Sequence, residues 1–239
     1  MVRYGAKGRG LTQPTPNRIR EPASPALAPE ACGKQSDSNP GPLGLFGGRF
    51  DPVHRAHLRV AQAVADQLGL NEVRWIVTGD PVHKSAVASA QDRLSMVKLA
   101  LGELADPRMQ ADDREIISAE KTGNPSYTAD TVAAIQAEQP GRRLIWILGE
   151  DQLQDFQTWS RWEWLVKNAE LAVCARPQAR SGETARRIQA AGGVIHWVSI
   201  EPDSVSSTQI RTFVRSKQQL TVLIPRSVAD YIDQHLLYQ

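Results

Sequence analysis

The sequence predicts an α/β protein with a doubly wound, mostly parallel sheet that is covered by helices on both faces. From Leu43 onward, short β-rich runs alternate with helical segments, which is typical of parallel sheets with right-handed crossovers. The 239 residues are 41% hydrophobic, which suffices for one sizeable core. Residues 1–42 hold seven prolines and five glycines without hydrophobic periodicity. We therefore predict a disordered extension over 1–42 and a single folded domain over 43–239.

Each predicted element follows from a local pattern. The apolar run LGLF at 43–46 predicts a buried strand, and HLRVAQAVADQL at 57–68 has the apolar spacing of a helix. The same pairing recurs in VRWIV with QDRLSMVKLALGEL, in RLIWIL with RWEWLVKN, in LAVCA with GETARRIQAA, and in VIHWV with SSTQIRTFVRS. After the second pair, we expect a connection through 115–117 to a helix at 126–138, SYTADTVAAIQAE.

The run GGRFDPVHRAHL at 47–58 follows the first expected strand and predicts a phosphate-binding turn. Gly47 and Gly48 are expected to take backbone angles that are closed to other residues, so that the main chain can approach a ligand closely. The helix that follows aims its free N–H groups and the positive end of its dipole at the same point. His54 and His57 lie on one face of this helix, near its start. An anion bound here would therefore meet two imidazoles.

Other interpretations of the histidine pair stay open from this run alone. The chain has neither GxGxxG after the first strand nor GxxxxGK[ST], so the two common nucleotide-binding signatures do not explain the pair. A metal site would need further Cys or acidic ligands at ligand spacing, and none lies nearby. A structural pair that packs or caps the helix is the second alternative.

A second candidate anion site lies in SSTQIR at 206–211. Its hydroxyl residues open a helix, and Arg211 follows within the first turn. In isolation, we would favour an ordinary N-cap with a surface arginine. Together with the run at 47–58, however, the segment predicts two helix N-termini that suit a polyphosphate chain.

Taken together, the segments 47–58 and 206–211 resemble those of a known protein family. The paired signatures GxFDPxHxGH and SSTxIR are similar to those of the adenylyl- and cytidylyltransferase superfamily related to class I aminoacyl-tRNA synthetases, and within it the chain resembles the bacterial nicotinate-nucleotide adenylyltransferases. Further segments of that family recur in order: PVHK at 81–84, NPSYT at 124–128, LGEDQLQDFQTW at 148–159, VCARP at 173–177 and LIPRSVADYI at 223–232. The resemblance covers 43–239. Three residues depart from the family pattern: Ala56 in place of the HxGH glycine, Arg49 in place of Thr or Ser, and Val82 in place of the second proline of PPHK.

The resemblance implies a Rossmann-like domain that transfers AMP from ATP to the 5′-phosphate of nicotinate mononucleotide, giving deamido-NAD and pyrophosphate. The catalytic residues it implies are His54, His57 and Arg211, with Ser207 and Thr208 beside Arg211 at the leaving phosphates. The ATP site would also include Gly47, Gly48, Phe50, Gly149 and Asp151, with Asp151 at the ribose. As a local alternative, Asp151 would cap the helix before QLQDF. Mg²⁺ is expected to arrive with ATP and to be held mainly through waters, without a dedicated metal site on the protein.

Separate residues are predicted to bind the acceptor. The face of Trp159 would attract the cationic pyridine ring, although a tryptophan in this segment is more often core. Free N–H groups at Tyr127 and Thr128, where a helix begins, favour a carboxylate over a neutral carboxamide. His83 and Lys84 are candidates for the phosphate of the acceptor, or are simply loop residues.

Composition disfavours other classes of protein. The extension 1–42 carries six basic and three acidic residues, which leaves 43–239 with a net charge of −1, a poor nucleic-acid surface. No apolar stretch approaches the roughly 18 residues of a membrane span, and the N-terminus lacks a secretory signal. Cys32 and Cys174 form no disulfide framework, which fits a cytoplasmic location. The basic start of the extension leaves a transit peptide open, but prolines 14 and 16 favour a misassigned start codon.

Two functional alternatives stay open from the sequence. The acceptor could be nicotinamide mononucleotide or another phosphate-bearing molecule. A non-catalytic ATP-binding homologue or sensor is the alternative from a different class, and Ala56 is its support, because its methyl group could crowd the nucleotide. The sequence leaves the oligomeric state open, a homo-oligomer included.

Overall fold

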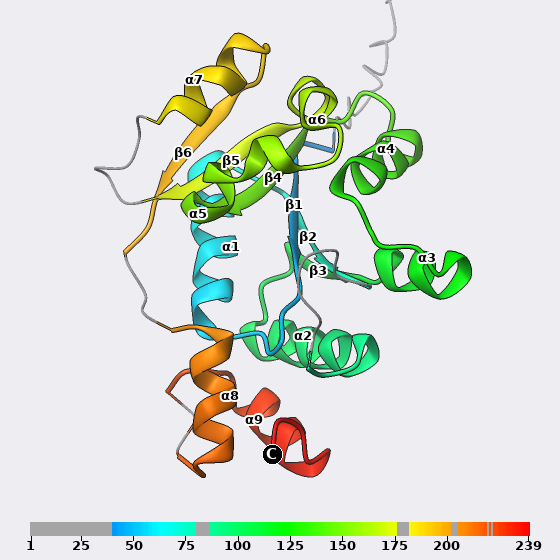
Figure 1. The fold of residues 1–239 in the computed structure, drawn as a ribbon. Helices are drawn as coiled ribbons and strands as arrows, with labels where there is room; N and C mark the ends of the chain where they lie inside the picture. Colours follow the sequence, from blue (N-terminus) through cyan, green and yellow to red (C-terminus); the bar gives the residue numbers. More distant parts are fainter. Residues whose placement is uncertain (1–39, 80–86, 176–181, 202–204, 219, 221) are drawn as a thin grey trace, which may run out of the picture. The chain divides into compact units, whose positions relative to one another are not determined.

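The computed structural model describes residues 40–239 except 80–86, 176–181, 202–204, 219 and 221 (Figure 1). Every described residue belongs to one compact unit, Ser38–Gln239. No helix within the described ranges combines the length and the apolar character that a membrane crossing requires.

One sheet of six parallel strands forms the centre of this unit. Its strands are β1 (Leu43–Gly48), β2 (Glu72–Val77), β3 (Met109–Asp112), β4 (Leu144–Gly149), β5 (Glu170–Ala175) and β6 (Ile195–Ser199). They are hydrogen-bonded in the order β3-β2-β1-β4-β5-β6, so the strand order reverses between β1 and β4. This is the strand order of a doubly wound fold, and the predicted fold class is confirmed.

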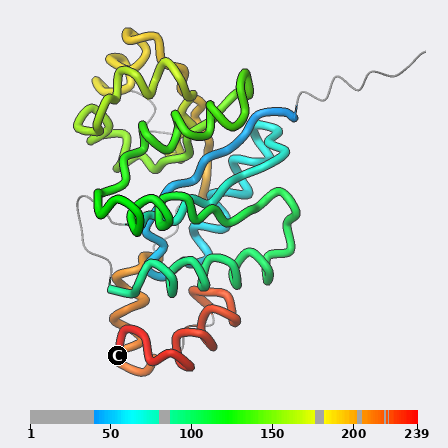
Figure 2. The backbone as a smooth tube through the Cα atoms, turned by 90° about the vertical axis from the view of Figure 1, so that its right-hand side faces the viewer, coloured from blue at the N-terminus to red at the C-terminus, as the bar shows by residue number. Residues whose placement is uncertain are grey.

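Helices cover both faces of this sheet (Figure 2). They are α1 (Arg55–Leu68), α2 (Ala90–Leu104), α3 (Arg114–Thr122), α4 (Thr128–Glu138), α5 (Glu150–Gln154), α6 (Trp162–Asn168), α7 (Glu183–Ala190), α8 (Ser207–Arg215) and α9 (Arg226–Gln234), with a 3₁₀ turn at Phe156–Thr158. Side chains of α1, α2, α8 and α9 share a core with Phe46 and Trp75 on one face. Side chains of α4, α5, α6 and α7 share a second core with Leu45 and Trp146 on the other face.

The region between β2 and α4 differs from the sequence prediction. The prediction had a connection through 115–117, whereas the chain forms the short strand β3 and then α3. β3 reads MQAD, and of its four residues only Met109 is buried. It pairs with β2 at the edge of the sheet. An edge strand that buries one residue lacks the hydrophobic pattern that distinguishes a strand from a loop.

Arg142 fixes the segment that leads into β1. Its guanidinium donates hydrogen bonds to the carbonyl oxygens of Gly41 (2.9 Å) and Pro40 (3.4 Å) and to Glu72 (2.6 Å). Residues just before β1 are therefore tied to β2 and to the loop before β4. The predicted boundary between extension and domain at residue 42 stays a prediction.

Candidate active site

A cavity of about 710 Å³ opens at the carboxyl ends of β1, β4 and β5. The strand order reverses at this point, and parallel sheets bind their ligands at such a reversal. Of the predicted site residues, its lining includes Gly47, Gly48, Phe50, His57, Gly149, Asp151 and Ser207. Arg49, Asp51, Val60, Cys174 and Ile200 line it as well. The structure thus brings residues from three strand ends and from α8 to one cavity.

Gly47 and Gly48 do not form the turn that the sequence analysis expected. Both belong to β1, and neither has a positive φ. The left-handed residue is Phe50, with a φ of 48°. What demands glycine is space, because a Cβ on Gly47 would lie 2.6 Å from the ring of Trp146, and one on Gly48 would lie 3.0 Å from the ring of Phe50. The two glycines therefore do not take special backbone angles, and the expected close approach of the main chain to a ligand stays a prediction.

Phe50, which lines the cavity, packs against His57. Its buried ring meets the His57 ring edge-on, with 5.2 Å between centroids, and it also contacts Phe46 and Trp75. Edge-to-face contacts of this kind fix the orientation of a ring as well as bury its surface. His57 is therefore held in place by an aromatic cluster and does not depend on the helix alone.

The hydrogen bond at the start of α1 determines which nitrogen of His57 carries its proton. The backbone N–H of His54, the N-cap residue, donates to Nδ1 of His57 at 3.2 Å. A ring nitrogen that accepts a hydrogen bond has no proton, so the neutral ring is protonated at Nε2. His57 also lines the cavity. It can therefore donate an N–H to an anion bound there.

His54 lies under His57 as a stacked, buried ring. The two centroids are 3.6 Å apart, and Nδ1 of His54 finds no hydrogen-bond partner among the described residues. Burial lowers the pKa of His54 to about 4, and burial together with His54 lowers the pKa of His57 well below 6.5. Both rings are thus neutral near pH 7, when each can donate a hydrogen bond without bringing a charge. His54 itself is not among the residues that line the cavity.

The two predicted anion segments meet, as the N-termini of α1 and α8 lie side by side (Figure 1). Ser207 Oγ donates to the carbonyl oxygen of Pro52 at 3.0 Å, and Arg211 donates to that of Asp51 at 2.7 Å. A second nitrogen of Arg211 donates to Thr208 Oγ1 at 3.1 Å. Arg211 is therefore held against the turn after β1. Thr208 and Arg211 flank the cavity lining and do not belong to it.

The alternative interpretation of SSTQIR at 206–211, an ordinary helix N-cap, is also present in the structure. Ser206 caps α8, because its Oγ accepts a hydrogen bond from the N–H of Gln209 at 3.2 Å. Capping and anion binding do not compete here, since the cap occupies one of the free N–H groups of the first turn and leaves the others.

Asp51 is a functional residue that the sequence analysis missed. Its carboxylate is buried and accepts hydrogen bonds from the N–H groups of Val87 (2.7 Å) and Ala88 (3.1 Å) and from the hydroxyl of Tyr238 (2.8 Å). Its carbonyl oxygen holds Arg211. A signal was present in the sequence, because Asp51 stands inside the FDPVH run, but its partners are far away along the chain.

Arg93 is the second missed residue. It is a fully buried arginine of α2 that donates to the carbonyl oxygens of Arg49 (2.9 Å), Gly79 (3.2 Å) and Ala88 (3.4 Å). Burial lowers the pKa of its guanidinium, against the charge of nearby Asp51. Arg93 thus joins the ends of β1 and β2 to the start of α2, beneath the cavity.

Gly149 and Asp151 lie at the end of β4, on the cavity wall. Gly149 is the N-cap of α5, so the alternative that Asp151 caps this helix was wrong. Asp151 is exposed in the first turn, and its Oδ1 would lie 2.6 Å from a Cβ on Gly149. Gly149 therefore leaves room for the carboxylate of Asp151 beside the strand end, where a ribose hydroxyl could bind to it.

Three of the predicted acceptor residues, Tyr127, Thr128 and Trp159, belong to the described part of the chain. α4 begins at Thr128 with the exposed Tyr127 as its N-cap. Trp159 is partly buried, 5.0 Å from the ring of Phe156 and 6.4 Å from the ring of Trp146, which in turn touches Gly47. Trp159 therefore contacts Trp146, whose ring packs against Gly47 in the lining of the cavity.

Arg161 joins the two acceptor segments. Its guanidinium pairs with Asp130 in the first turn of α4, and Arg161 follows Trp159 by two residues. The helix N-terminus at Tyr127 and the ring of Trp159 are therefore brought toward each other. Two further predicted residues, His83 and Lys84, lie outside the described residues.

Three further observations concern Ala56, Cys174 and the possible metal ligands among the described residues. Ala56 lies in the first turn of α1 and is not among the lining residues, so its methyl group, the feature that favoured a non-catalytic homologue, does not enter the cavity. Cys174 lines the cavity, but burial raises the pKa of its thiol to about 12, which keeps it from acting as a nucleophile. Within the described ranges, no group of three or more His, Cys, Asp and Glu side chains could hold a metal ion.

Glu115 is a buried carboxyl group next to the segment that begins α4. Its Oε1 accepts a hydrogen bond from Thr131 Oγ1 at 2.6 Å, and the residue is 7% exposed. Burial raises its pKa to about 7 from an ordinary 4.5, although the hydrogen bond from Thr131 opposes the shift. Between these two pH values the folded state keeps a proton that the unfolded state has released. Stability is therefore lost as the pH rises from about 4.5 to about 7.

The variant Glu115→Gln is expected to gain stability relative to wild type as the pH rises, by about 2 to 3 kcal/mol between pH 5 and pH 8. Urea unfolding of both proteins at the two pH values measures this gain. Glu120→Gln, an exposed position on the same helix, is the matched control and should show no such gain. A stability difference for Glu115→Gln that is equal at both pH values would contradict the assignment.

Comparison with known proteins agrees with this geometry. The cytidylyltransferase-like family model matches residues 45–213. The chain is 39% identical over 204 residues to the "probable nicotinate-nucleotide adenylyltransferase" of Neisseria meningitidis serogroup B, covering 82% of this chain and 98% of that protein. It is 38% identical over 214 residues to the protein of the same name from Chromobacterium violaceum, with the same coverage of each.

Solved structures share the fold. The nicotinic acid mononucleotide adenylyltransferase of Plasmodium falciparum, complexed with NaAD, superposes with a TM-score of 0.68 at 19% identity, over 83% of this chain and 97% of that one. The same protein complexed with APC gives a TM-score of 0.66 at 18% identity, with the same coverage. This chain therefore shares the fold of that protein over most of its length.

Proposed function

Because this chain belongs to the cytidylyltransferase-like family and, within it, to the nicotinate-nucleotide adenylyltransferases, we propose that it transfers AMP from ATP to the 5′-phosphate of nicotinate mononucleotide. The products are nicotinate adenine dinucleotide (deamido-NAD) and pyrophosphate, and the reaction belongs to NAD biosynthesis. The observation that carries the proposal is the cavity at which the N-termini of α1 and α8 converge.

The attacking group needs no base from the protein. A phosphate monoester has a second pKa of about 6, so nicotinate mononucleotide already presents an ionised oxygen near neutral pH. This oxygen attacks the α-phosphorus in line with the departing pyrophosphate. The protein contributes position and charge stabilisation, which suits a cavity lined by the neutral donor His57.

His57 donates from Nε2 to an oxygen of the α-phosphate as negative charge spreads in the transition state. Its ring is pre-oriented by Phe50 and by the N–H of His54, so little reorganisation is needed. His54 stacks beneath it with an unused polar nitrogen, which supports a role at the same phosphate once ATP is bound.

The leaving pyrophosphate is assigned to α8. Ser207, Thr208 and Arg211 stand in its first turns, where N–H groups and the helix dipole favour negative charge. The guanidinium of Arg211 keeps two hydrogen bonds to the protein and adds a positive charge to this end of the cavity. Charge that builds on the leaving oxygens is thereby neutralised.

Residues of the described chain fit a magnesium ion that arrives with ATP. Asp51, which lines the cavity, has its carboxylate occupied by three N–H and O–H donors, whereas Asp151 is an exposed carboxylate of the same lining. Asp151 would therefore be the carboxylate of the two that is available to the ion or to its waters. When bound, the ion reduces the negative charge of the phosphates. Asp151 is assigned to the ribose of ATP, as Gly149 gives it room.

The acceptor is assigned to Tyr127, Thr128 and Trp159. Trp159 offers an aromatic face to the pyridinium ring, and the first N–H groups of α4 suit its carboxylate. A neutral carboxamide gains less from a positive helix end, which is the physical reason for preferring the acid over the amide. His83 and Lys84 remain candidates for the phosphate of the acceptor. A cytoplasmic location is kept as a prediction, and the oligomeric state stays open, a homo-oligomer included.

Pyrophosphate release tests the function directly. With ATP and Mg²⁺, we expect kcat/KM to be up to about 5-fold higher for nicotinate mononucleotide than for nicotinamide mononucleotide, since a carboxylate at a helix N-terminus contributes up to about 1 kcal/mol. Phosphopantetheine and glycerol phosphate serve as controls and should give no release. Binding of ATP without release from any acceptor would overturn the proposal in favour of a sensor, and preference for the amide would overturn the acceptor assignment.

A further inference from the structure

We infer that Tyr238 is a positioning residue for this reaction, because its hydroxyl fixes the Asp51 carboxylate and thereby the turn that holds Arg211 and leads into α1 with His57. The inference rests on the proposed function for its kinetic consequence. The structural part of the inference concerns only contacts within the protein, so it can be tested without measuring enzymatic turnover.

The contact is built into the interior. Tyr238 and Asp51 are 6% and 2% exposed, and Tyr238 Oη lies 2.8 Å from Asp51 Oδ1. Tyr238 has a φ of 66°, a left-handed conformation that is uncommon for a residue with a side chain. The backbone therefore adopts a disfavoured angle where the ring enters the core beside the cavity. Such angles persist only where the surrounding contacts impose them.

Tyr238 completes the donor set of a buried carboxylate. The N–H groups of Val87 and Ala88 supply two hydrogen bonds to Asp51, and the hydroxyl of Tyr238 is the side-chain donor among the three. Burial, and then the charge of Asp51, raise the pKa of the Tyr238 hydroxyl, so it stays protonated and remains a donor across any practical assay pH. Without it, Asp51 would keep a buried lone pair unsatisfied and would reorient to find another donor.

The backbone of Asp51, in turn, holds Arg211. The carbonyl oxygen of Asp51 accepts the hydrogen bond of Arg211 at 2.7 Å, and the next carbonyl, of Pro52, accepts that of Ser207. A reoriented Asp51 would move these two carbonyls and, with them, the groups that face the leaving phosphates. The expected defect therefore lies in kcat more than in the KM for ATP, because the groups that move act on charge that develops in the transition state.

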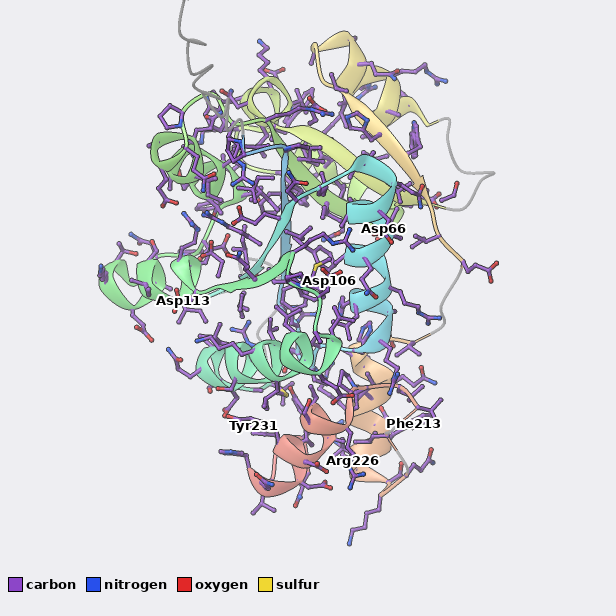
Figure 3. All side chains as sticks on the ribbon, turned by 180° about the vertical axis from the view of Figure 1, so that it is seen from behind. Asp66, Asp106, Asp113, Phe213, Arg226 and Tyr231 are labelled. Atoms are coloured by element: carbon purple, nitrogen blue, oxygen red, sulfur yellow. The ribbon has the colours of Figure 1, made fainter. Side chains whose placement is uncertain are left out.

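A matched control exists on the neighbouring helix. Tyr231 of α9 donates from its hydroxyl to Asp92 Oδ1 at 3.0 Å, and Figure 3 labels it where α9 packs against α2. This is the same tyrosine–carboxylate hydrogen bond in the same part of the chain, but Asp92 is not among the residues that line the cavity. Tyr231→Phe therefore measures what the loss of such a bond costs the fold alone.

The experiment compares Tyr238→Phe and Tyr231→Phe with wild type in the full chain. For Tyr238→Phe we expect kcat to fall about 10-fold while the KM for ATP changes by less than about 3-fold. In parallel, hydrogen exchange followed by mass spectrometry should show faster exchange confined to peptides that cover 49–58 and 206–211. Tyr231→Phe should leave kcat and the exchange of these peptides at wild-type values.

An unchanged kcat and unchanged exchange in Tyr238→Phe would overturn the inference. Equal losses in the two variants, with exchange raised throughout the domain, would also overturn it, because the hydroxyl would then serve the fold in general. If wild type makes no nicotinate adenine dinucleotide, the proposed function fails. Faster exchange confined to the two peptides in Tyr238→Phe would still support the positioning role in that case.

Discussion

Replacing His57 with alanine is expected to lower kcat about 100-fold, because the substitution removes a donor that acts on the α-phosphate in the transition state. This loss corresponds to about 2.7 kcal/mol of transition-state stabilisation. The free energy of unfolding should fall by only about 1 kcal/mol, since the folded state gives up the acceptor for the N–H of His54 and the ring contacts of His57 with Phe50, Phe46 and His54.

A second substitution separates these two effects. Glutamine at position 57 can accept the N–H of His54 from the third position of the helix, as in a capping box, so His57→Gln should recover most of the lost stability. It should not recover the rate, since its amide cannot both cap the helix and reach the place of Nε2. Steady-state kinetics and urea unfolding of the two variants provide the measurement. Wild-type turnover in His57→Ala would remove the ring from the mechanism.

Replacing Arg211 with lysine is the second large effect, with kcat again reduced about 100-fold although the charge is kept. The guanidinium reaches the carbonyl of Asp51 and the hydroxyl of Thr208 from two nitrogens at once. A single ammonium group cannot hold both contacts and also meet a phosphate. The defect should therefore reflect lost geometry and should not be corrected by raising the ATP concentration.

Arg215→Lys is the control for this variant. Arg215 is exposed one turn further along α8, so the same change of side chain is made there away from the cavity. This control should turn over at the wild-type rate under the same conditions. Equal activity of Arg211→Lys and Arg215→Lys would show that any positive charge on α8 suffices, contrary to the role given to the two hydrogen bonds.

Local patterns in the sequence were enough to predict the doubly wound sheet. They also predicted the segments 47–58 and 206–211, which meet where the strand order reverses. β1 and β4 are fully apolar over most of their length, and the hydroxyl residues at 206–208 stand at a helix start. Each of these signals lies within a few residues. β3 escaped prediction because it is a four-residue edge strand with one buried side chain.

The parts that could not be predicted depend on contacts between distant residues. Asp51 meets Tyr238, Arg93 meets the ends of two strands, and Gly47 faces the ring of Trp146. No local pattern specifies such partners, because each partner is chosen by the packing of the whole domain. The glycines illustrate the difference, since their spacing predicted a turn with special backbone angles while a tryptophan from β4 explains the small size of Gly47.

The low pKa values of the stacked histidines affect how the rate of the reaction depends on pH. Burial lowers the pKa of His54 to about 4 and that of His57 well below 6.5, so both rings are neutral near pH 7. The phosphate of nicotinate mononucleotide has a second pKa of about 6, so in mildly acidic surroundings less of this acceptor carries the dianionic phosphate that attacks ATP. The supply of NAD precursor would then fall with the ionisation of a metabolite, while the buried ring of His54 stays neutral down to a pH of about 4.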